Sequence, residues 1–237
     1  MIPYYIKIER YCKEEMKEMG YQTILFDMDG TVLDTLYDLW VSTNAVLREL
    51  GYPERTLEEI RSYVGNGARN QIRCALPEGS GDAVIDDALK RYQAYYAEHC
   101  RDHTQPYEGI LPMLRALDAA GKQLAVVSNK PDRMVKLLSE EHFGRLMHVA
   151  IGETPERRRK PAPDTVYAAL DALGASGDGA VYVGDSEVDV ATARAAGLPL
   201  LAVSWGFRGR AALEQAGAEV IIDSPEALTQ RILAEIE

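Results

Sequence analysis

The chain has few cysteines and no long apolar run. Its 237 residues include three cysteines, Cys12, Cys74 and Cys100, with neither an even count nor the spacing of a metal site. This pattern indicates reduced thiols, as in the cytoplasm. No apolar segment approaches membrane-spanning length, and the N-terminus carries Lys, Glu and Arg where a secretion signal would be apolar. We therefore expect a cytoplasmic protein that does not interact with membranes.

Positive charge is also scarce. Lys and Arg number 26 against 37 Asp and Glu, so the formal net charge is −11. Nucleic acids and anionic membranes are bound through Lys and Arg patches, and neither is an expected partner. The one basic cluster, residues 157–160, is local and more typical of a solvated loop than of a second anion site. Hydrophobic residues at 46% and charged residues at 27% are typical of a soluble globular protein with a sizeable core.

The stretch from Ile24 to Thr31 organises the chain. An apolar run ends in two carboxylates, Asp27 and Asp29, which are followed by Gly30 and a hydroxyl. The run is typical of a short buried strand that ends at a turn. Two carboxylates this close repel each other in a cleft, and Mg²⁺ with oxygen ligands would relieve the repulsion and leave room for a phosphate. Taken alone, the stretch could equally be a surface turn.

Two kinds of pattern follow one another along the chain. Residues 36–106 show helical patterns only, whereas strands and helices alternate from Tyr107 onward. Helices are predicted at residues 36–50, 68–75, 82–99, 110–120, 132–142, 164–173 and 187–196, with further helices starting after Thr56 and Ser224, and strands at 123–128, 148–151, 180–184, 200–204 and 220–222. In the helix over 82–99, Val84, Ala88, Tyr92 and Tyr95 are expected to form the packed face.

Alternating strands and helices imply a parallel sheet that is covered on both faces. The sequence therefore predicts an α/β fold, a doubly wound (Rossmann-like) parallel sheet core with an inserted α-helical cap domain. The core is expected to comprise residues 23–35 and 107–237, and the cap residues 36–106. Residues 1–22 are predicted to be an N-terminal extension, with a possible helix over 6–19.

Polar side chains recur at the carboxyl ends of the predicted strands. Each has an ordinary explanation by itself, such as a helix cap, a solvated lysine or an acidic helix N-terminus. Ligands of doubly wound folds bind beyond the carboxyl ends of the strands, so the recurrence indicates one shared site. Its candidate members are Asp27, Ser128 with Asn129, Lys160, and Asp185 with Asp189.

These residues resemble the four motifs of the haloacid dehalogenase-like hydrolase superfamily. The resemblance rests on residues 27–31, on Ser128, on Lys160-Pro161, and on Gly184-Asp185 with Asp189 four residues later. The helical insertion resembles the small cap of the subfamily that includes phosphoglycolate phosphatase, and residues 64–68 are similar to a segment of those enzymes. The resemblance extends from about residue 23 to the C-terminus.

The resemblance implies a role for each motif in phosphoryl transfer. Asp27 would be the nucleophile that forms an aspartyl-phosphate, and Asp29 would act as acid and then as base. Ser128 and the adjacent backbone at Asn129 would bind a phosphoryl oxygen. Lys160 would neutralise charge on the phosphoryl group and on the nucleophile.

The resemblance also implies a magnesium site. Mg²⁺ would be bound by Asp27, the main-chain carbonyl of Asp29, and Asp185, with Asp189 nearby. The expected function is a Mg²⁺-dependent phosphatase acting on a small phosphorylated metabolite, most similar to phosphoglycolate. A β-phosphoglucomutase-like phosphomutase, an inorganic pyrophosphatase and a non-catalytic phosphometabolite-binding protein are the alternatives. The sequence does not distinguish a monomer from a homodimer.

The cap is expected to face the phosphate site and to select the substrate. Asn66, Arg69 and Asn70 are candidates for contact with the leaving group, although the glycines at 65 and 67 could simply form a turn. Arg69 would suit a substrate carboxylate through a bidentate pair. The segments 34–35 and 105–107 are the candidate hinges of a moving cap.

Overall fold

β1 (Thr23–Phe26) lies at the centre of a parallel sheet, in a computed structural model that describes residues 20–234. Within these residues the strand order is β5-β4-β1-β6-β7-β8, and every pair is parallel. The chain runs outward through β4 and β5, then crosses to the other side of β1, so the switch in strand order lies at β1. The strands are β4 (Gln123–Pro131), β5 (Val149–Glu153), β6 (Ala180–Gly184), β7 (Leu200–Val203) and β8 (Ile221–Ile222).

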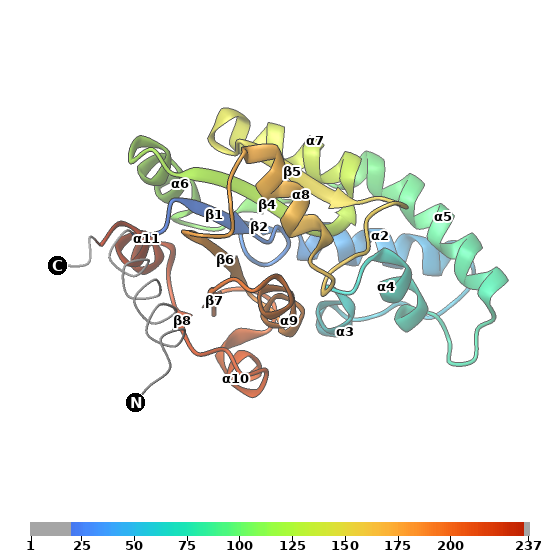
Figure 1. Cartoon of the computed structure of the whole chain (residues 1–237). Coiled ribbons are helices and arrows are strands. Elements are labelled where there is room, and N and C mark those ends of the chain that lie inside the picture. Colours follow the sequence, from blue (N-terminus) through green and yellow to red (C-terminus); the bar gives the residue numbers. More distant parts are fainter. Residues whose placement is uncertain (1–19, 235–237) are drawn as a thin grey trace.

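Helices cover both faces of the sheet, as Figure 1 shows. Side chains alternate across a strand, so Ile24 and Phe26 of β1 pack on one face and Leu25 on the other. The first face is covered by α6 (Ile110–Ala119), α7 (Asp132–Phe143) and α11 (Pro225–Leu233), and the second by α8 (Asp164–Leu173) and α9 (Glu187–Ala196), with α10 (Gly209–Gln215) beside β7. The predicted α/β doubly wound core is confirmed.

Four helices lie between β2 (Leu33–Asp34) and β3 (Gln105–Pro106), two short strands that follow β1, and in Figure 1 these helices lie together at the right. They are α2 (Leu36–Glu49), α3 (Leu57–Tyr63), α4 (Ala68–Ala75) and α5 (Asp82–His99). The chain enters this helical insertion through β2 and leaves it through β3, and these two strands pair antiparallel. The two predicted hinge segments therefore lie side by side. Among the described residues, no helix has the length and apolar character needed to span a bilayer.

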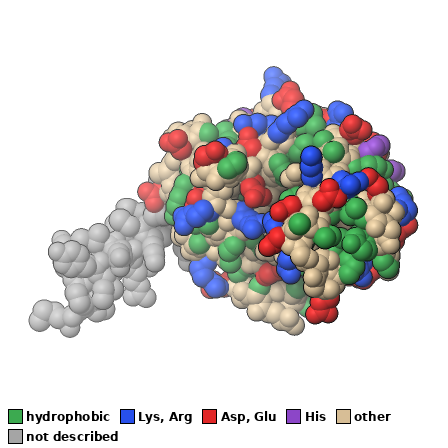
Figure 2. All heavy atoms as spheres, turned by 90° about the vertical axis from the view of Figure 1, so that its right-hand side faces the viewer, with side chains coloured by type: hydrophobic (Ala, Val, Ile, Leu, Met, Phe, Trp, Pro, Cys, Tyr) green, Lys and Arg blue, Asp and Glu red, His purple; other side chains and the backbone are tan. Residues whose placement is uncertain are grey.

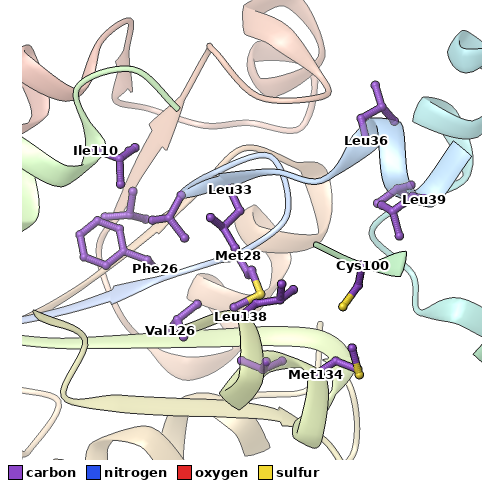
Figure 3. Packing of buried hydrophobic residues seen from close by; sticks show 14 of the residues in the cluster. Phe26, Met28, Leu33, Leu36, Leu39, Cys100, Ile110, Val126, Met134 and Leu138 are labelled. Atoms are coloured by element: carbon purple, nitrogen blue, oxygen red, sulfur yellow. The ribbon is translucent and has the colours of Figure 1, made fainter. Parts of the chain in front are cut away.

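The hydrophobic core runs without a break from the sheet into the insertion. Figure 3 shows Met28 and Leu33 between Phe26 of the sheet and Leu36 and Leu39 of α2, and all five belong to one buried cluster. Apolar packing therefore joins the insertion to the sheet beside the first linker. Treating residues 36–106 as a separate cap domain stays a prediction, and the predicted helix over 6–19 lies outside the described residues.

The predicted packed face of α5 is wrong at two of its four positions. The structure buries Ile85, Ala88, Tyr92 and Tyr96, so Ala88 and Tyr92 are confirmed, whereas Val84 is 37% exposed and Tyr95 is only partly buried. The predicted and observed sets both combine steps of three and four residues, so helical periodicity could not choose between them. The rings of Tyr92 and Tyr96 stack 5.5 Å apart, and their burial agrees with a packing role.

Asp38, in the first turn of α2, ties the insertion to the segment that returns to the core. Its buried carboxylate accepts hydrogen bonds from the backbone N–H groups of His103 (3.0 Å) and Thr104 (2.8 Å) and from the Thr104 hydroxyl (2.8 Å). His103 Nδ1 lies 2.9 Å from the same carboxylate. An ionised carboxylate can accept all these bonds at once, because its two oxygens together offer about four acceptor sites.

We predict that Asp38→Asn lowers the free energy of unfolding by about 2 kcal/mol, because an NH₂ group replaces an acceptor that faces buried donors. The urea midpoint measures the effect. Asp87→Asn is the matched control, since Asp87 pairs with Arg91 on the exposed face of α5, and its cost should stay below about 0.5 kcal/mol. Equal midpoints for the two variants would contradict this prediction.

Candidate active site

A cavity of about 230 Å³ lies where the carboxyl ends of β1, β4 and β6 meet the helical insertion. Its lining includes six of the residues predicted from the sequence: Asp27, Asp29, Ser128, Asn129, Lys160 and Asp185. The first two follow β1, the next two lie in β4, Lys160 precedes α8, and Asp185 follows β6. The parallel sheet thus gathers polar groups from distant parts of the sequence.

Asp27 is held firmly in this cavity. Its Oδ1 accepts a hydrogen bond from the N–H of Met28 (2.7 Å) and lies 2.7 Å from Lys160 Nζ. Burial raises the pKa of Asp27, the carboxylate of Asp189 raises it further, and Lys160 opposes both effects. Burial disfavours the charged form of Lys160, but the carboxylates of Asp189 and Asp27 outweigh it and raise its pKa well above the ordinary value. Lys160 therefore remains an ammonium beside Asp27.

Asp189 binds the ammonium of Lys160 from within the protein core. Its Oδ1 accepts from Lys160 Nζ (2.9 Å) and from the Tyr182 hydroxyl (3.0 Å), and its Oδ2 accepts from the N–H (3.1 Å) and the hydroxyl (2.6 Å) of Ser186. Ser186 and Asp189 also form the capping box that starts α9. Asp189 is fully buried and is not among the described residues that line the cavity. This geometry favours an anchoring role.

Negative charge exceeds positive charge around Lys160. Asp27, Asp185 and Asp189 offer oxygen atoms that all lie within 4.8 Å of one another. Burial, followed by the carboxylate of Asp189, raises the pKa of Asp185 to about 7, although the N–H of Phe207 opposes this. Clustered carboxylate oxygens with an unbalanced charge suit a hard divalent cation. The residues present therefore fit Mg²⁺, with Asp27 and Asp185 as the carboxylates that face the cavity.

Backbone packs closely around Asp185. Its Oδ1 accepts from the Thr31 hydroxyl (3.1 Å) and its Oδ2 from the Phe207 N–H (2.7 Å). A Cβ atom at Gly206 would lie 2.3 Å from Asp185 Cβ and from the Gly30 carbonyl oxygen, and one at Gly30 would lie 2.5 Å from Asp185 Oδ2. Only glycine fits at either position without displacing the carboxylate.

Asp29 contacts two residues that the sequence analysis missed. Its Oδ1 accepts from the Thr35 hydroxyl (2.6 Å) and lies 3.2 Å from Lys130 Nζ. β4 continues to Pro131 instead of ending at Ser128 as predicted, and a strand places residues i and i+2 on the same face. That period would have suggested Lys130 as a neighbour of Ser128, although the register of β4 shifts between Val127 and Pro131. Thr35 carries no comparable signal.

Two core residues bind the backbone of the insertion at the edge of the cavity. Asn129 Nδ2 donates to the carbonyls of Lys160 (3.0 Å) and Gly65 (3.0 Å), and its Oδ1 accepts from the Lys160 N–H (2.7 Å). Arg208, also missed, donates to the Val64 carbonyl (2.6 Å). The side chain of Asn129 therefore holds the Lys160 loop in place, and its predicted contact with phosphate stays a prediction.

The predicted substrate ligands of the insertion lie elsewhere. Arg69 Nη2 lies 3.0 Å from a carboxylate oxygen of Asp82 and 3.0 Å from one of Asp86. Asn66 and Asn70, like Arg69, are not among the described residues that line the cavity. Their contact with substrate stays a prediction. The insertion instead lines the cavity with residues that include Leu39, Val64, Gln71, Tyr92 and Tyr96.

Comparison with known proteins agrees with this geometry. Residues 24–203 match the family model of the haloacid dehalogenase-like hydrolases. A phosphoglycolate phosphatase of Pseudomonas syringae pv. syringae is 36% identical over 208 residues, which cover 84% of this chain and 76% of that protein. One from Xanthomonas campestris pv. campestris is 36% identical over 191 residues, 79% of this chain and 85% of that protein.

A solved structure is also similar over nearly the whole chain. The crystal structure of a Lactobacillus delbrueckii subsp. bulgaricus protein, provisionally named a phosphoglycolate phosphatase, has a TM-score of 0.87 and 37% identity. The match covers 92% of this chain and 100% of that one. The chain therefore belongs to the haloacid dehalogenase-like hydrolases and is an enzyme of their phosphoglycolate phosphatase-like group.

Proposed function

We propose that this enzyme is a Mg²⁺-dependent phosphatase that hydrolyses a small phosphate monoester similar to phosphoglycolate. The observation that carries the proposal is the presence of Asp27, Asp29, Ser128 and Lys160 around one cavity. A volume of about 230 Å³ suits a small metabolite, because pockets for drug-sized ligands are larger. The curated relatives named phosphoglycolate phosphatases support this substrate class.

Hydrolysis would proceed in two steps. In the first, an oxygen of Asp27 attacks phosphorus, the bond from phosphorus to the leaving oxygen breaks, and Asp29 gives that oxygen its proton. In the second, Asp29 takes a proton from water, the water oxygen attacks phosphorus, and the carboxylate of Asp27 is released with inorganic phosphate. The Thr35 hydroxyl, 2.6 Å from Asp29 Oδ1, orients Asp29 for both transfers.

Positioning and charge account for most of the catalysis in phosphoryl transfer. Ser128 would hydrogen-bond a phosphoryl oxygen. Lys160 would neutralise negative charge on the phosphoryl group and on Asp27 as the two come together. Asp189 and Tyr182 hold the Lys160 ammonium in place. Mg²⁺ bound by Asp27, Asp185 and the main-chain carbonyl of Asp29 would reduce the repulsion between the nucleophile and the anionic phosphate.

The proposed partner is a small phosphorylated metabolite, and the proposed location is the cytoplasm. Cys74 and Cys100 are free thiols, as a reducing compartment would leave them. On the face of the molecule in Figure 2, acidic and basic side chains are interspersed, without the broad basic patch that nucleic acid binding requires.

We predict that 2-phosphoglycolate releases phosphate faster than pyrophosphate, β-glucose 1-phosphate or nucleotides, and that a chelator stops the release. A phosphate-release assay with added Mg²⁺ tests each substrate. Faster release from pyrophosphate would favour a pyrophosphatase. Conversion of β-glucose 1-phosphate to glucose 6-phosphate without net release would favour a phosphomutase.

Asp27→Asn should reduce phosphate release to less than about one-thousandth of the wild-type rate, because an amide cannot act as the nucleophile. The melting temperature should show that the variant remains folded. Asp178→Asn, at an exposed position away from the cavity, is the matched control. Retained turnover in Asp27→Asn would contradict an aspartyl-phosphate mechanism.

The stabilisation by Mg²⁺ should be larger at about pH 8 than at about pH 6. Without metal, folded Asp185 keeps its proton up to about pH 7, whereas an unfolded aspartate loses it near 3.8. The stability of the metal-free protein therefore falls as the pH rises toward 7. At pH 6, Mg²⁺ must displace that proton to bind.

Melting temperatures with and without Mg²⁺ at the two pH values measure this effect. Asp185→Asn should remove most of the Mg²⁺-dependent shift at both pH values. A larger shift at pH 6 than at pH 8 would disprove the assignment of Asp185 as a ligand.

A further inference from the structure

Lys130 is a buried ammonium to which the proposed mechanism gives no role. Its side chain is 5% exposed and lines the cavity. Nζ donates to the Tyr96 hydroxyl of α5 (2.8 Å) and lies 3.2 Å from Asp29 Oδ1. An ammonium carries three donors, and these contacts use two of them. Nζ also lies over the Tyr96 ring, 4.5 Å from its centre, and the third N–H has no hydrogen-bond partner among the described residues.

The other cationic side chains that line the cavity either bind several partners already or are exposed. Lys160 binds Asp27 and Asp189. Arg208 binds Glu187 and carbonyl groups of the insertion. Arg133 is exposed. Among the described cations that line the cavity, Lys130 is buried, pairs with one carboxylate only, that of Asp29, and is therefore best placed to meet a charged group beyond the phosphate.

The leaving group must lie close to Lys130. The leaving oxygen has to come within about 3 Å of Asp29 to receive its proton, and Lys130 Nζ is 3.2 Å from the same carboxyl group. A carboxylate one carbon away from that oxygen can reach Nζ.

We infer that Lys130, positioned by the Tyr96 hydroxyl, binds an anionic group on the leaving group and so selects phosphate esters of 2-hydroxy acids. This inference rests on the proposed phosphatase function. The surrounding cavity wall is apolar at Leu39 and Met134, and a charge-assisted hydrogen bond is stronger in such surroundings. An uncharged leaving group would leave Lys130 without this contact.

The test compares kcat/KM for 2-phosphoglycolate with kcat/KM for ethyl phosphate, which has a methyl group in place of the carboxylate. Lys130→Met keeps an unbranched apolar chain and removes the charge. It should lower kcat/KM for 2-phosphoglycolate by about 10- to 100-fold more than for ethyl phosphate. Lys136→Met is the matched control, because Lys136 is exposed on α7 and pairs with Asp132. This variant should leave kcat/KM unchanged for both substrates.

Tyr96→Phe provides a milder second variant. It keeps the ring and removes the hydroxyl that holds Lys130, so the preference for 2-phosphoglycolate should fall by a smaller factor in the same direction. If Lys130→Met does not fold, as judged by its melting temperature, Tyr96→Phe alone decides between the outcomes.

Three results would overturn the inference. An equal loss on both substrates would show that Lys130 only supports Asp29. Loss of the preference in Arg69→Met, with the preference kept in Lys130→Met, would assign the carboxylate to Arg69. If the wild type with Mg²⁺ hydrolyses neither substrate, the proposed function itself fails, whereas hydrolysis of both at equal rates overturns only the role of Lys130.

Discussion

The structure of the site depends on an excess of buried negative charge at the carboxyl ends of the central strands. Asp27 and Asp189 both bind the ammonium of Lys160, and Asp185 offers an oxygen within 4.8 Å of theirs. Hydrogen bonds from Tyr182, Ser186 and backbone N–H groups hold the carboxylates in place but do not cancel their charge. Such a cluster of carboxylate oxygens suits a divalent cation, and a cation bound there would also favour an anionic substrate.

Three consecutive residues of β4 lie beside this charged centre, and two of them bind the insertion. Ser128 lines the cavity, Asn129 reaches the Gly65 carbonyl, and Lys130 reaches the Tyr96 hydroxyl. A shift of the insertion relative to the sheet would alter the partners of residues that line the cavity. The short β2–β3 pair, where the chain passes between the two parts, is compatible with such a shift.

Much of this site could be predicted because its residues lie at the carboxyl ends of parallel strands, which meet at one edge of the sheet. Asp27, Ser128 and Asp185 each follow an apolar run, and that pattern is visible in the sequence. The contacts of Asp38 with His103 and Thr104, or of Thr35 with Asp29, join side chains that no local period relates. The two-residue strands β2 and β3 are too short to show alternation, and the buried face of α5 depends on what it packs against.

The close approach of Gly206 to Asp185 and the Gly30 carbonyl affects how sequence variants of this enzyme are interpreted. A single methyl group added at Gly206 would push aside a carboxylate without altering any charged or hydrogen-bonding residue. Damaging changes therefore need not fall on the acidic motifs at all, because an alanine at position 206 would displace the Asp185 carboxylate while every aspartate stays intact.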